Sequence, residues 1–315
     1  MTDSPILSVI LCTYNNADSL EITLRQLGQC KVEDPTGVEV LVVDNNSTDH
    51  TANVVEVAQG DSAAPIKYCF EPKQGLSSAR NHGVQAAQGS YLLFTDDDAD
   101  IPENWLSSYL EKVQSTDADC LFSRIEVRWD RNPPWWFDKR FNPYFVHLDY
   151  GARQFQVIDL HHEFFGKNFC CRKSVLESLG GFDEQLGRKG ASHAAGEETI
   201  IYQRLINQSA VVIYFPEAPV GHRLKPIEYT SANIEKKFVD GASSSLLIAN
   251  SFATKRIFGR PTYPLKKAVG GCLSSLFSLA VKFFQKDDES RRDAFFHLLQ
   301  FKRAIRMIKL WITTP

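Results

Sequence analysis

Short apolar stretches alternate with helix-like stretches through the first hundred residues, and this alternation limits the folds open to the chain. Apolar runs rich in β-branched residues lie at 6–13 and 38–44, and two further strand-like runs lie at 66–70 and 90–95. Between them, apolar residues at three- and four-residue spacing predict helices at 17–28, 48–59 and 76–88. Strands that are apolar on both faces and separated by helices form βαβ units. We therefore expect an α/β fold with a mostly parallel sheet flanked by helices.

Shorter signals place helix ends and later elements. Ser47 or Thr48 can cap the helix at 48–59, and Gly89 can close the helix at 76–88. Later in the chain we expect a helix and a Gly-Gly turn, then a helix, a strand and a long helix, at 172–182, 197–208, 211–215 and 233–258.

Polar residues directly follow three of the expected strands. These clusters are Thr13-Tyr14-Asn15, Asp44-Asn45-Asn46 and Asp96-Asp97-Asp98. Ligands of open parallel sheets bind outside the carboxyl ends of the strands. We therefore expect the three clusters to converge on one site.

Composition and charge exclude several classes of protein. The chain is 43% hydrophobic and 23% charged, as in ordinary globular proteins, which excludes disordered, collagen-like and coiled-coil chains. A net charge of −3 argues against a nucleic-acid binder, which needs a basic surface. The charge is uneven, because residues 266–309 carry a net +6.

Seven cysteines without a C-x-x-C pair favour buried reduced thiols. The N-terminal apolar run favours a first strand over a signal peptide, so we expect a cytoplasmic protein.

The run Asp96-Asp97-Asp98 is the strongest single signal for chemistry. Three carboxylates after an apolar strand repel one another unless a cation neutralises them. A hard divalent cation with a phosphate-bearing ligand suits such oxygen ligands. The alternative is an exposed acidic turn in which Asp98, Asp100 or both cap a helix that begins at Pro102.

Several other polar residues carry both a functional and a structural interpretation. Asp44 can accept hydrogen bonds from a ribose or a base, or it can cap the helix at 48–59. Arg80 can pair with a phosphate or with the acidic triad, or it can form a surface salt bridge. Glu197 and Glu198, at a helix start, can supply a general base or merely complement the helix dipole. His222 can be a ligand, although a lone histidine is more often structural.

Five stretches together make the chain resemble the family 2 glycosyltransferases, which have the GT-A fold. They occur in the family's order and cover about residues 6–225. The stretches are SVILCTYNNADSL (8–20), VEVLVVDNNSTDHT (38–51), KQGLSSARNHGVQAAQGSYLLFTDDDADIPENWL (73–106), GKNFCCRKSVLESLGGFDEQLG (166–187) and GEETIIYQRL (196–205).

The resemblance implies roles for the residues that match the family's donor site. Thr13, Tyr14 and Asn15 match the loop that holds the nucleotide. Asp44 matches the acid that contacts its base, and Arg80 matches the arginine near the diphosphate.

A divalent metal, Mg²⁺ or Mn²⁺, is also implied by the resemblance. Asp96, Asp97 and Asp98 form a D-x-D motif, whose acids contact the ribose of the donor and hold the metal on the diphosphate. Asp96 and Asp98 are the expected metal ligands. His222 falls where family members often place another metal or phosphate contact.

The same resemblance implies an inverting mechanism. Glu198 matches the second position of a Glu-Asp pair, where Asp usually acts as the catalytic base, and the choice between Glu197 and Glu198 stays open. The base deprotonates an acceptor hydroxyl, while the metal neutralises charge on the departing diphosphate. Processive members carry Q-x-x-R-W, whereas Gln300-Phe-Lys-Arg303 is followed here by Ala304. We expect that segment to be helix surface, and the enzyme to add a single sugar.

The rest of the chain suggests an acceptor region and a helical tail. The aromatic run at 128–145 predicts a loop over a binding cleft, where Trp135 and Trp136 stack on a sugar or line an acceptor groove, or else cover the edge of the core. We expect 1–225 to form the catalytic domain and 226–315 a helical extension.

The tail mixes basic and apolar residues. Ala268–Val281 is uncharged but too short to cross a membrane. Residues 289–312 suit a helix on anionic lipid, or else a helix packed on the catalytic domain. The expected partners are a nucleotide-sugar donor, a glycan or lipid-linked acceptor and, through the tail, the inner face of a membrane.

Two other functions are compatible with the sequence. A metal-dependent nucleotidyltransferase also uses paired acids on an α/β sheet, although it usually has a Gly-rich loop after the first strand, and TYNNAD has no glycine. A non-catalytic nucleotide-binding protein is the other, because the Glu-Glu pair departs from the family's Glu-Asp.

Overall fold

A computed structural model describes residues 4–62, 64–189, 195–282 and 287–313. Contacts divide the chain into two compact units. The first contains 1–128, 145–185 and 197–223, and the second contains 129–144, 186–196 and 224–315. The aromatic segment 129–144 thus groups with the C-terminal helices. The domain boundary expected at residue 225 stays a prediction.

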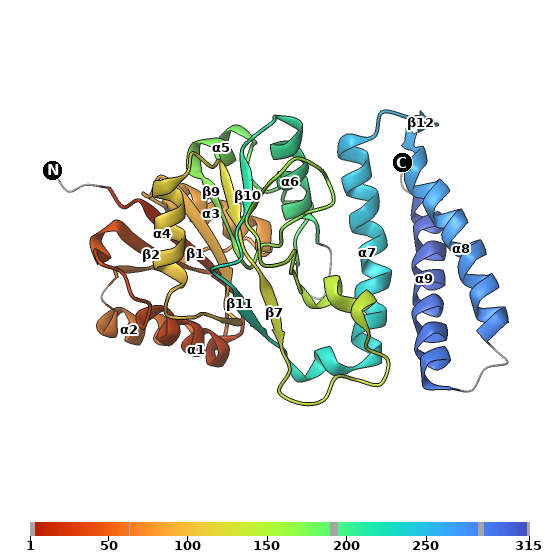
Figure 1. Cartoon of the computed structure of the whole chain (residues 1–315), viewed down its shortest axis with the longest axis horizontal. Helices are drawn as coiled ribbons and strands as arrows, with labels where there is room; N and C mark the ends of the chain where they lie inside the picture. The colour runs from red at the N-terminus through yellow and green to blue at the C-terminus, as the bar shows by residue number, and fades with distance from the viewer. Residues whose placement is uncertain (1–3, 63, 190–194, 283–286, 314–315) are drawn as a thin grey trace. The chain divides into compact units, whose positions relative to one another are not determined.

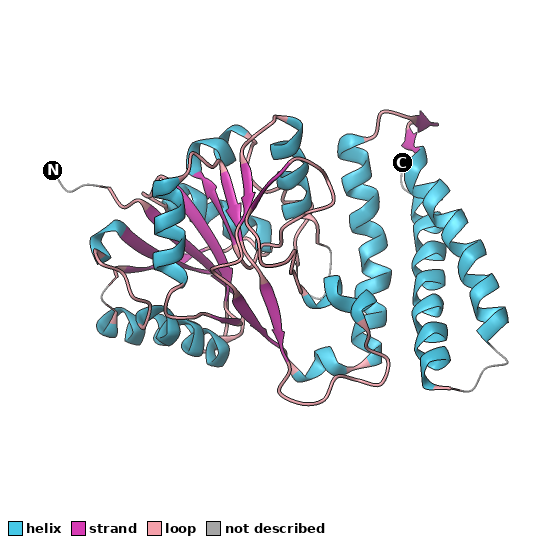
Figure 2. Cartoon of the chain, in the orientation of Figure 1, coloured by secondary structure: helices cyan, strands magenta, loops and turns pink. Residues whose placement is uncertain are grey.

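An eight-stranded sheet forms the centre of the first unit (Figures 1 and 2). Its order is β3-β2-β1-β4-β9-β6-β10-β8. Strands β1, β2, β3 and β4 are mutually parallel, as are β6 and β10, whereas β9 and β8 run antiparallel to their neighbours. The expected mostly parallel α/β sheet is therefore confirmed. The strands are β1 Leu7–Thr13, β2 Val38–Asp44, β3 Ile66–Phe70, β4 Tyr91–Asp96, β6 Cys120–Phe122, β8 Phe155–Val157, β9 Phe169–Arg172 and β10 Val212–Tyr214.

Helices flank this sheet, and most lie where the apolar spacing predicts them (Figure 1). They are α1 Ala17–Gly28, α2 Thr51–Asp61, α3 Leu76–Ala86, α4 Trp105–Ser115, α5 Lys173–Ser178 and α6 Glu197–Asn207, with 3₁₀ turns at Pro35–Gly37, Lys139–Phe145 and Pro226–Tyr229.

The helix caps predicted at Ser47, Thr48 and Gly89 are wrong, whereas Asp49, the other candidate for the second helix, does contact its start. Helix α2 begins at Thr51, whose backbone N–H donates to the carboxylate of Asp49 at 3.1 Å, so neither Ser47 nor Thr48 caps it. Helix α3 ends at Ala86, before Gly89. Gly89 instead donates its N–H to the Ser8 hydroxyl at 2.8 Å, and an added Cβ would lie 2.7 Å from the backbone nitrogen of Ser8. The glycine is needed for close approach to β1 and not for ending a helix.

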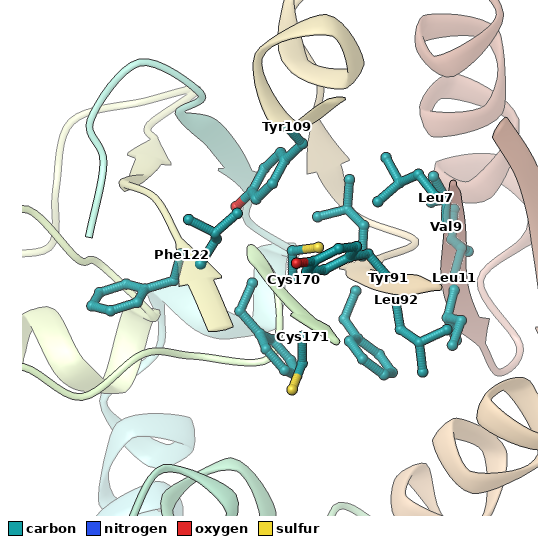
Figure 3. Close-up of a cluster of buried hydrophobic side chains, with 14 of the residues drawn as sticks. Leu7, Val9, Leu11, Tyr91, Leu92, Tyr109, Phe122, Cys170 and Cys171 are labelled. Atoms are coloured by element: carbon teal, nitrogen blue, oxygen red, sulfur yellow. The ribbon is translucent and has the colours of Figure 1, made fainter. Parts of the chain in front are cut away.

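Apolar side chains from the central strands and the flanking helices fill the core of the first unit, and Figure 3 shows the part of it around β1, β4, β6 and β9. Apolar and polar residues do not alternate along these strands, because helices cover both faces of the sheet. The apolar runs are therefore continuous. The rings of Phe94 and Phe169 stack at 4.6 Å, and Phe169 stacks in turn on Phe164 at 4.5 Å. Burying each such side chain stabilises the fold by about 1.5–3 kcal/mol. All seven cysteines are free thiols, five of them buried.

A small second sheet brings a late part of the chain to the end of β4. It consists of β5 Ala99–Asp100, β11 Val220–Arg223 and β7 Ile125–Arg128. Strands β5 and β11 are antiparallel, with His222 paired to Ala99. This register fixes His222 next to the acidic triad.

The second unit is built on three long helices, which run side by side in Figure 1. They are α7 Ser231–Phe252, α8 Thr262–Lys282 and α9 Asp288–Thr313, and a short hairpin of β12 Arg256–Ile257 and β13 Arg260–Pro261 joins α7 to α8. Helix α9 packs against both α7 and α8. None of the helices in the described ranges has the length and apolarity needed to span a membrane.

The aromatic segment 129–144 packs within the second unit. Trp136 is buried, with its ring 5.2 Å from that of Phe141 and 5.9 Å from that of Phe295 on α9. Trp135 is half exposed, with the Arg291 guanidinium 5.3 Å from its ring centre. For Trp136, the interpretation as a cover of apolar core is therefore the correct one, and stacking on a sugar is not.

Arg303 also departs from its predicted place on a helix surface. It is partly buried, and its guanidinium donates to the hydroxyls of Tyr144 at 3.0 Å and Ser245 at 2.8 Å. It holds α9 against α7.

Candidate active site

The polar clusters after three neighbouring strands converge, as the sequence predicts. Thr13 and Asp44 are register partners at the ends of β1 and β2, and Asp96 pairs with Cys12 at the end of β4. Asp97 lies one residue beyond, and its carboxylate accepts hydrogen bonds from the Thr13 hydroxyl and the Asn16 amide, both at 2.7 Å. Asp97 thus anchors the loop after β1.

Asn15 joins the loops after β1 and β2. Its N–H donates to the Ser47 hydroxyl at 3.0 Å, and its side-chain oxygen accepts from the Thr48 N–H at 2.7 Å. Its φ of 46° is a left-handed conformation that Asn tolerates better than most residues. Tyr14, between these anchors, is 44% exposed. The loop therefore offers an accessible aromatic ring on a fixed backbone.

Asp44 does not cap α2. It is buried, and its carboxylate accepts from the Ser47 N–H at 2.8 Å and from the Tyr68 hydroxyl at 2.7 Å. Burial, together with this bond and the negative charge of Asp44, raises the pKa of Tyr68 to about 12. The phenol therefore stays protonated and keeps donating to Asp44.

Arg80 is buried among three carboxylates and is not part of a surface salt bridge. Its side chain is 3% exposed, and its guanidinium lies 2.8 Å from Glu197, 3.4 Å from Glu198 and 3.6 Å from Asp96. Burial alone would lower the pKa of Arg80, but the carboxylates of Glu198, Glu197 and Asp96 outweigh it and raise that pKa. The cation is permanent, and it joins the end of β4 to the start of α6.

Glu197 and Glu198 have different surroundings. The side chain of Glu197 is 2% exposed and is held against Arg80, whereas that of Glu198 is 16% exposed. Glu198 also accepts a hydrogen bond from the Gly166 N–H at 3.0 Å. A Cβ at position 166 would lie 2.1 Å from Arg80 and 2.5 Å from Glu198, so a larger residue there would displace one of these two side chains. Glu198 is the more accessible carboxylate of the two.

Two side chains from other elements contact Asp98. The Lys167 ammonium donates to both Asp98 and Asp96, the latter at 3.1 Å. The Nε2 atom of His222 lies 3.5 Å from Asp98. Burial alone would raise the pKa of Asp98, but Lys167 and His222 hold it well below its usual range. The predicted turn with Asp98 or Asp100 as a helix cap is wrong, because α4 begins later, at Trp105.

The side chains of Asp96, Asp98 and His222 offer carboxylate oxygens and an imidazole nitrogen, which are atom types that bind divalent cations. The Nδ1 atom of His222 lies 2.7 Å from the carbonyl oxygen of Phe145, and since a carbonyl only accepts, Nδ1 carries the proton. A backbone carbonyl that orients a histidine in this way is common at metal sites. Within the described residues, however, no three His, Cys, Asp or Glu side chains are grouped closely enough to hold a metal ion by themselves.

Comparison with known proteins places this arrangement in a family. The model of glycosyl transferase family 2 matches residues 8–180, more than half of the chain. The chain belongs to glycosyl transferase family 2. It is 26% identical over 224 residues to glucosyl-dolichyl phosphate glucuronosyltransferase of Haloferax volcanii, covering 69% of each chain. It is 25% identical over 244 residues to succinoglycan biosynthesis protein ExoM of Rhizobium meliloti, covering 76% of this chain and 74% of that protein.

Solved structures share the fold of this glycosyltransferase. The mannosyltransferase PcManGT of Pyrobaculum calidifontis, solved with GDP-Man and Mn²⁺, aligns with a TM-score of 0.59 and 16% identity over 98% of this chain and 88% of that one. The expected GT-A fold and enzyme class are thus confirmed, and the chain functions in glycan or glycolipid synthesis.

Sequence analysis of this glycosyltransferase missed two cations of the site. Lys167 lies two residues before the buried strand β9, and Arg223 carries no signal beyond its place next to His222. The Arg223 guanidinium donates to the Ala99 carbonyl at 2.6 Å, Asp100 at 3.0 Å and Thr23 at 2.6 Å. It fixes the segment that follows the triad.

Glu163 gives the glycosyltransferase a pH-dependent stability. Burial and the charge of Glu198 raise its pKa to about 7, although a hydrogen bond from Thr199 opposes the shift. The folded state then binds more protons than the unfolded state, so its stability falls as pH rises from about 4.5 through about 7. We expect Glu163→Gln to be more stable than the wild type at pH 8, with a smaller difference at pH 5. Urea unfolding at both pH values measures this, and an equal difference at both would contradict it.

Proposed function

We propose that this chain is an inverting, metal-dependent, non-processive glycosyltransferase. It transfers one sugar from a nucleotide-diphospho-sugar to an acceptor hydroxyl. The observation that carries this proposal is the Arg80 network, which joins Asp96 at the end of β4 to Glu198 at the start of α6. A proposed donor-binding acid and a candidate base thus share one buried guanidinium.

The donor side of the proposal rests on the loops after β1 and β2. Thr13, Tyr14 and Asn15 would contact the nucleotide, with the exposed Tyr14 ring available to the base. Asp44 would accept hydrogen bonds from the base or ribose, and Asp97 would hold the loop in place while it contacts the donor. Arg80 lies close enough to Asp96 to stabilise negative charge on a diphosphate bound there.

Asp96, Asp98 and His222 are the residues that would hold Mg²⁺ or Mn²⁺. The ion, when bound, stabilises the negative charge of the departing nucleoside diphosphate. The proton on Nδ1 of His222 leaves Nε2 as the ring nitrogen that faces Asp98. The solved relative with GDP-Man and Mn²⁺ supports a divalent ion in this fold.

Glu198 is the base in this proposal and Glu197 its structural neighbour. Glu198 would remove the proton from the acceptor hydroxyl, which then attacks the anomeric carbon from the face opposite the leaving group. The Gly166 N–H holds one carboxylate oxygen of Glu198 in place. The proposed acceptor is a glycan or a lipid-linked sugar, since the Haloferax relative is named for a dolichyl phosphate substrate.

Helix α8 supports association with a membrane surface. Val269, Leu273, Leu276 and Phe277, here termed the α8 stripe, are all 45% or more exposed. Their spacing places them on one helix face, and exposed lysines at 266 and 267 precede them. A helix with an apolar face and basic flanks binds at the interface of anionic lipid. We propose that the α8 stripe contacts such a surface, close to a lipid-linked acceptor. The cytoplasmic location stays a prediction.

Substituting the α8 stripe is expected to abolish binding to lipid. Leu273→Glu with Phe277→Glu places two charges at the most exposed part of the stripe, so the full chain should no longer sediment with vesicles that contain phosphatidylglycerol. Val57→Glu is the matched control, because Val57 is an exposed apolar residue on α2 outside the stripe. Wild-type binding to phosphatidylcholine vesicles should be weak. Unchanged sedimentation of the double variant would refute the membrane contact.

A panel of nucleotide-sugars tests the reaction itself. The full chain is incubated with each donor and Mn²⁺ or Mg²⁺, and the products are identified by mass spectrometry. Free nucleoside diphosphate supports the glycosyltransferase, and pyrophosphate would instead indicate a nucleotidyltransferase. Binding of a nucleotide without turnover of any donor would indicate a non-catalytic protein.

A further inference from the structure

Lys167 lies where the sequence leads one to expect a metal ion. Its ammonium contacts Asp96 at 3.1 Å and also pairs with Asp98, the two ends of the D-x-D motif. The side chain is only 2% exposed. One buried unit charge therefore already bridges both carboxylates.

The backbone around Lys167 leaves it little freedom to turn away. Gly166 is held by Glu198, and the Asn168 side chain accepts from the Trp105 indole at 2.9 Å. The same Asn168 amide donates to the carbonyls of Arg124 at 2.8 Å and Ala218 at 2.9 Å. Both neighbours of Lys167 are thus anchored by hydrogen bonds, which fixes where its side chain leaves the backbone.

We propose that the Lys167 ammonium is the resident cation of the Asp96 and Asp98 carboxylates, and that a divalent ion binds them only in competition with it. This inference rests on the metal dependence proposed above. Two cations a few ångströms apart repel strongly where water is largely excluded. The free protein should therefore bind a divalent ion weakly. The negative charge of a bound nucleoside diphosphate would offset this repulsion, so the ion would bind more tightly with the donor than alone.

Titration of the full chain with Mn²⁺ alone tests this competition. Free Mn²⁺ is followed by electron paramagnetic resonance. We expect Lys167→Met to bind Mn²⁺ at least about tenfold more tightly than the wild type, since the competing charge is gone. Lys167→Arg keeps the charge and should bind as weakly as the wild type. Lys31→Met is the control for a charge lost elsewhere, since Lys31 forms an exposed pair with Glu103, and it should leave the affinity unchanged.

Thermal unfolding gives a second measurement that does not depend on enzyme activity. Mn²⁺ should raise the Tm of Lys167→Met and have little effect on the wild type. Lys167→Gln replaces the methionine variant if that variant does not fold. Equal Mn²⁺ affinity in the wild type and the variant would overturn the competition while leaving metal dependence intact. Absence of Mn²⁺ binding in both would overturn the competition and argue against the proposed metal site as well.

Discussion

Glu198→Gln is expected to reduce sugar transfer by about 10²–10⁴-fold, the usual contribution of a general base. Gln keeps an oxygen that can accept from the Gly166 N–H, and Arg80 retains Glu197 and Asp96 as partners. The fold and the donor site should therefore survive. The measurement is kcat with the donor found in the panel, together with calorimetric titration of its nucleoside diphosphate.

Glu197→Gln is the matched variant one residue away. Glu197 is buried against Arg80, so its replacement should lower stability more than Glu198→Gln does. If Glu198→Gln turns over donor at the wild-type rate, Glu198 is not the base. Loss of nucleotide binding in that variant would instead indicate that Glu198 belongs to the donor site.

Arg80→Met is expected to lower the free energy of unfolding by about 3–5 kcal/mol, the usual effect of removing one partner from a buried ion pair. Three carboxylates converge on this guanidinium, and without it their mutual repulsion is uncompensated. Urea unfolding followed by circular dichroism measures the loss.

Arg25→Met provides the comparison for Arg80→Met. Arg25 is exposed on α1, and surface substitutions of this kind usually change stability by less than about 0.5 kcal/mol. Equal stability of the two variants would show that the Arg80 network does not hold β4 to α6.

The sequence predicts most of the first unit because its signals are local. The strands ending at Thr13 and Asp44 and the helix from Ala17 to Gly28 lie where the apolar spacing indicates. The convergence of their polar ends follows from the rules of parallel sheets. Helix caps were predicted less well, since Gly89 is small for a reason that involves β1 and not its own helix.

Apart from the pairing of Arg80 with Asp96, the ion pairs of the site could not be predicted, because they join residues that are far apart in the sequence. Lys167 reaches Asp98 only because β9 is inserted antiparallel beside β4. Glu197 and Glu198 look equivalent in the sequence, but consecutive helix positions point about 100° apart. Only the packing of α6 determines which of them lies against Arg80.

The reversed direction of β9 has a further consequence for how such an enzyme can change. In a purely parallel sheet, the working edge is supplied only by segments that leave strands. Here Phe169, the first residue of β9, pairs with Phe94 near the end of β4, so a segment entering a strand reaches the same edge. Residues 163–168 therefore form a segment of the site that is separate from the loops after β1 and β2. Exchanging residues 163–168 between relatives should alter the charge next to Asp96 and Asp98, and therefore the affinity for a divalent ion. The preference for one nucleotide should stay the same.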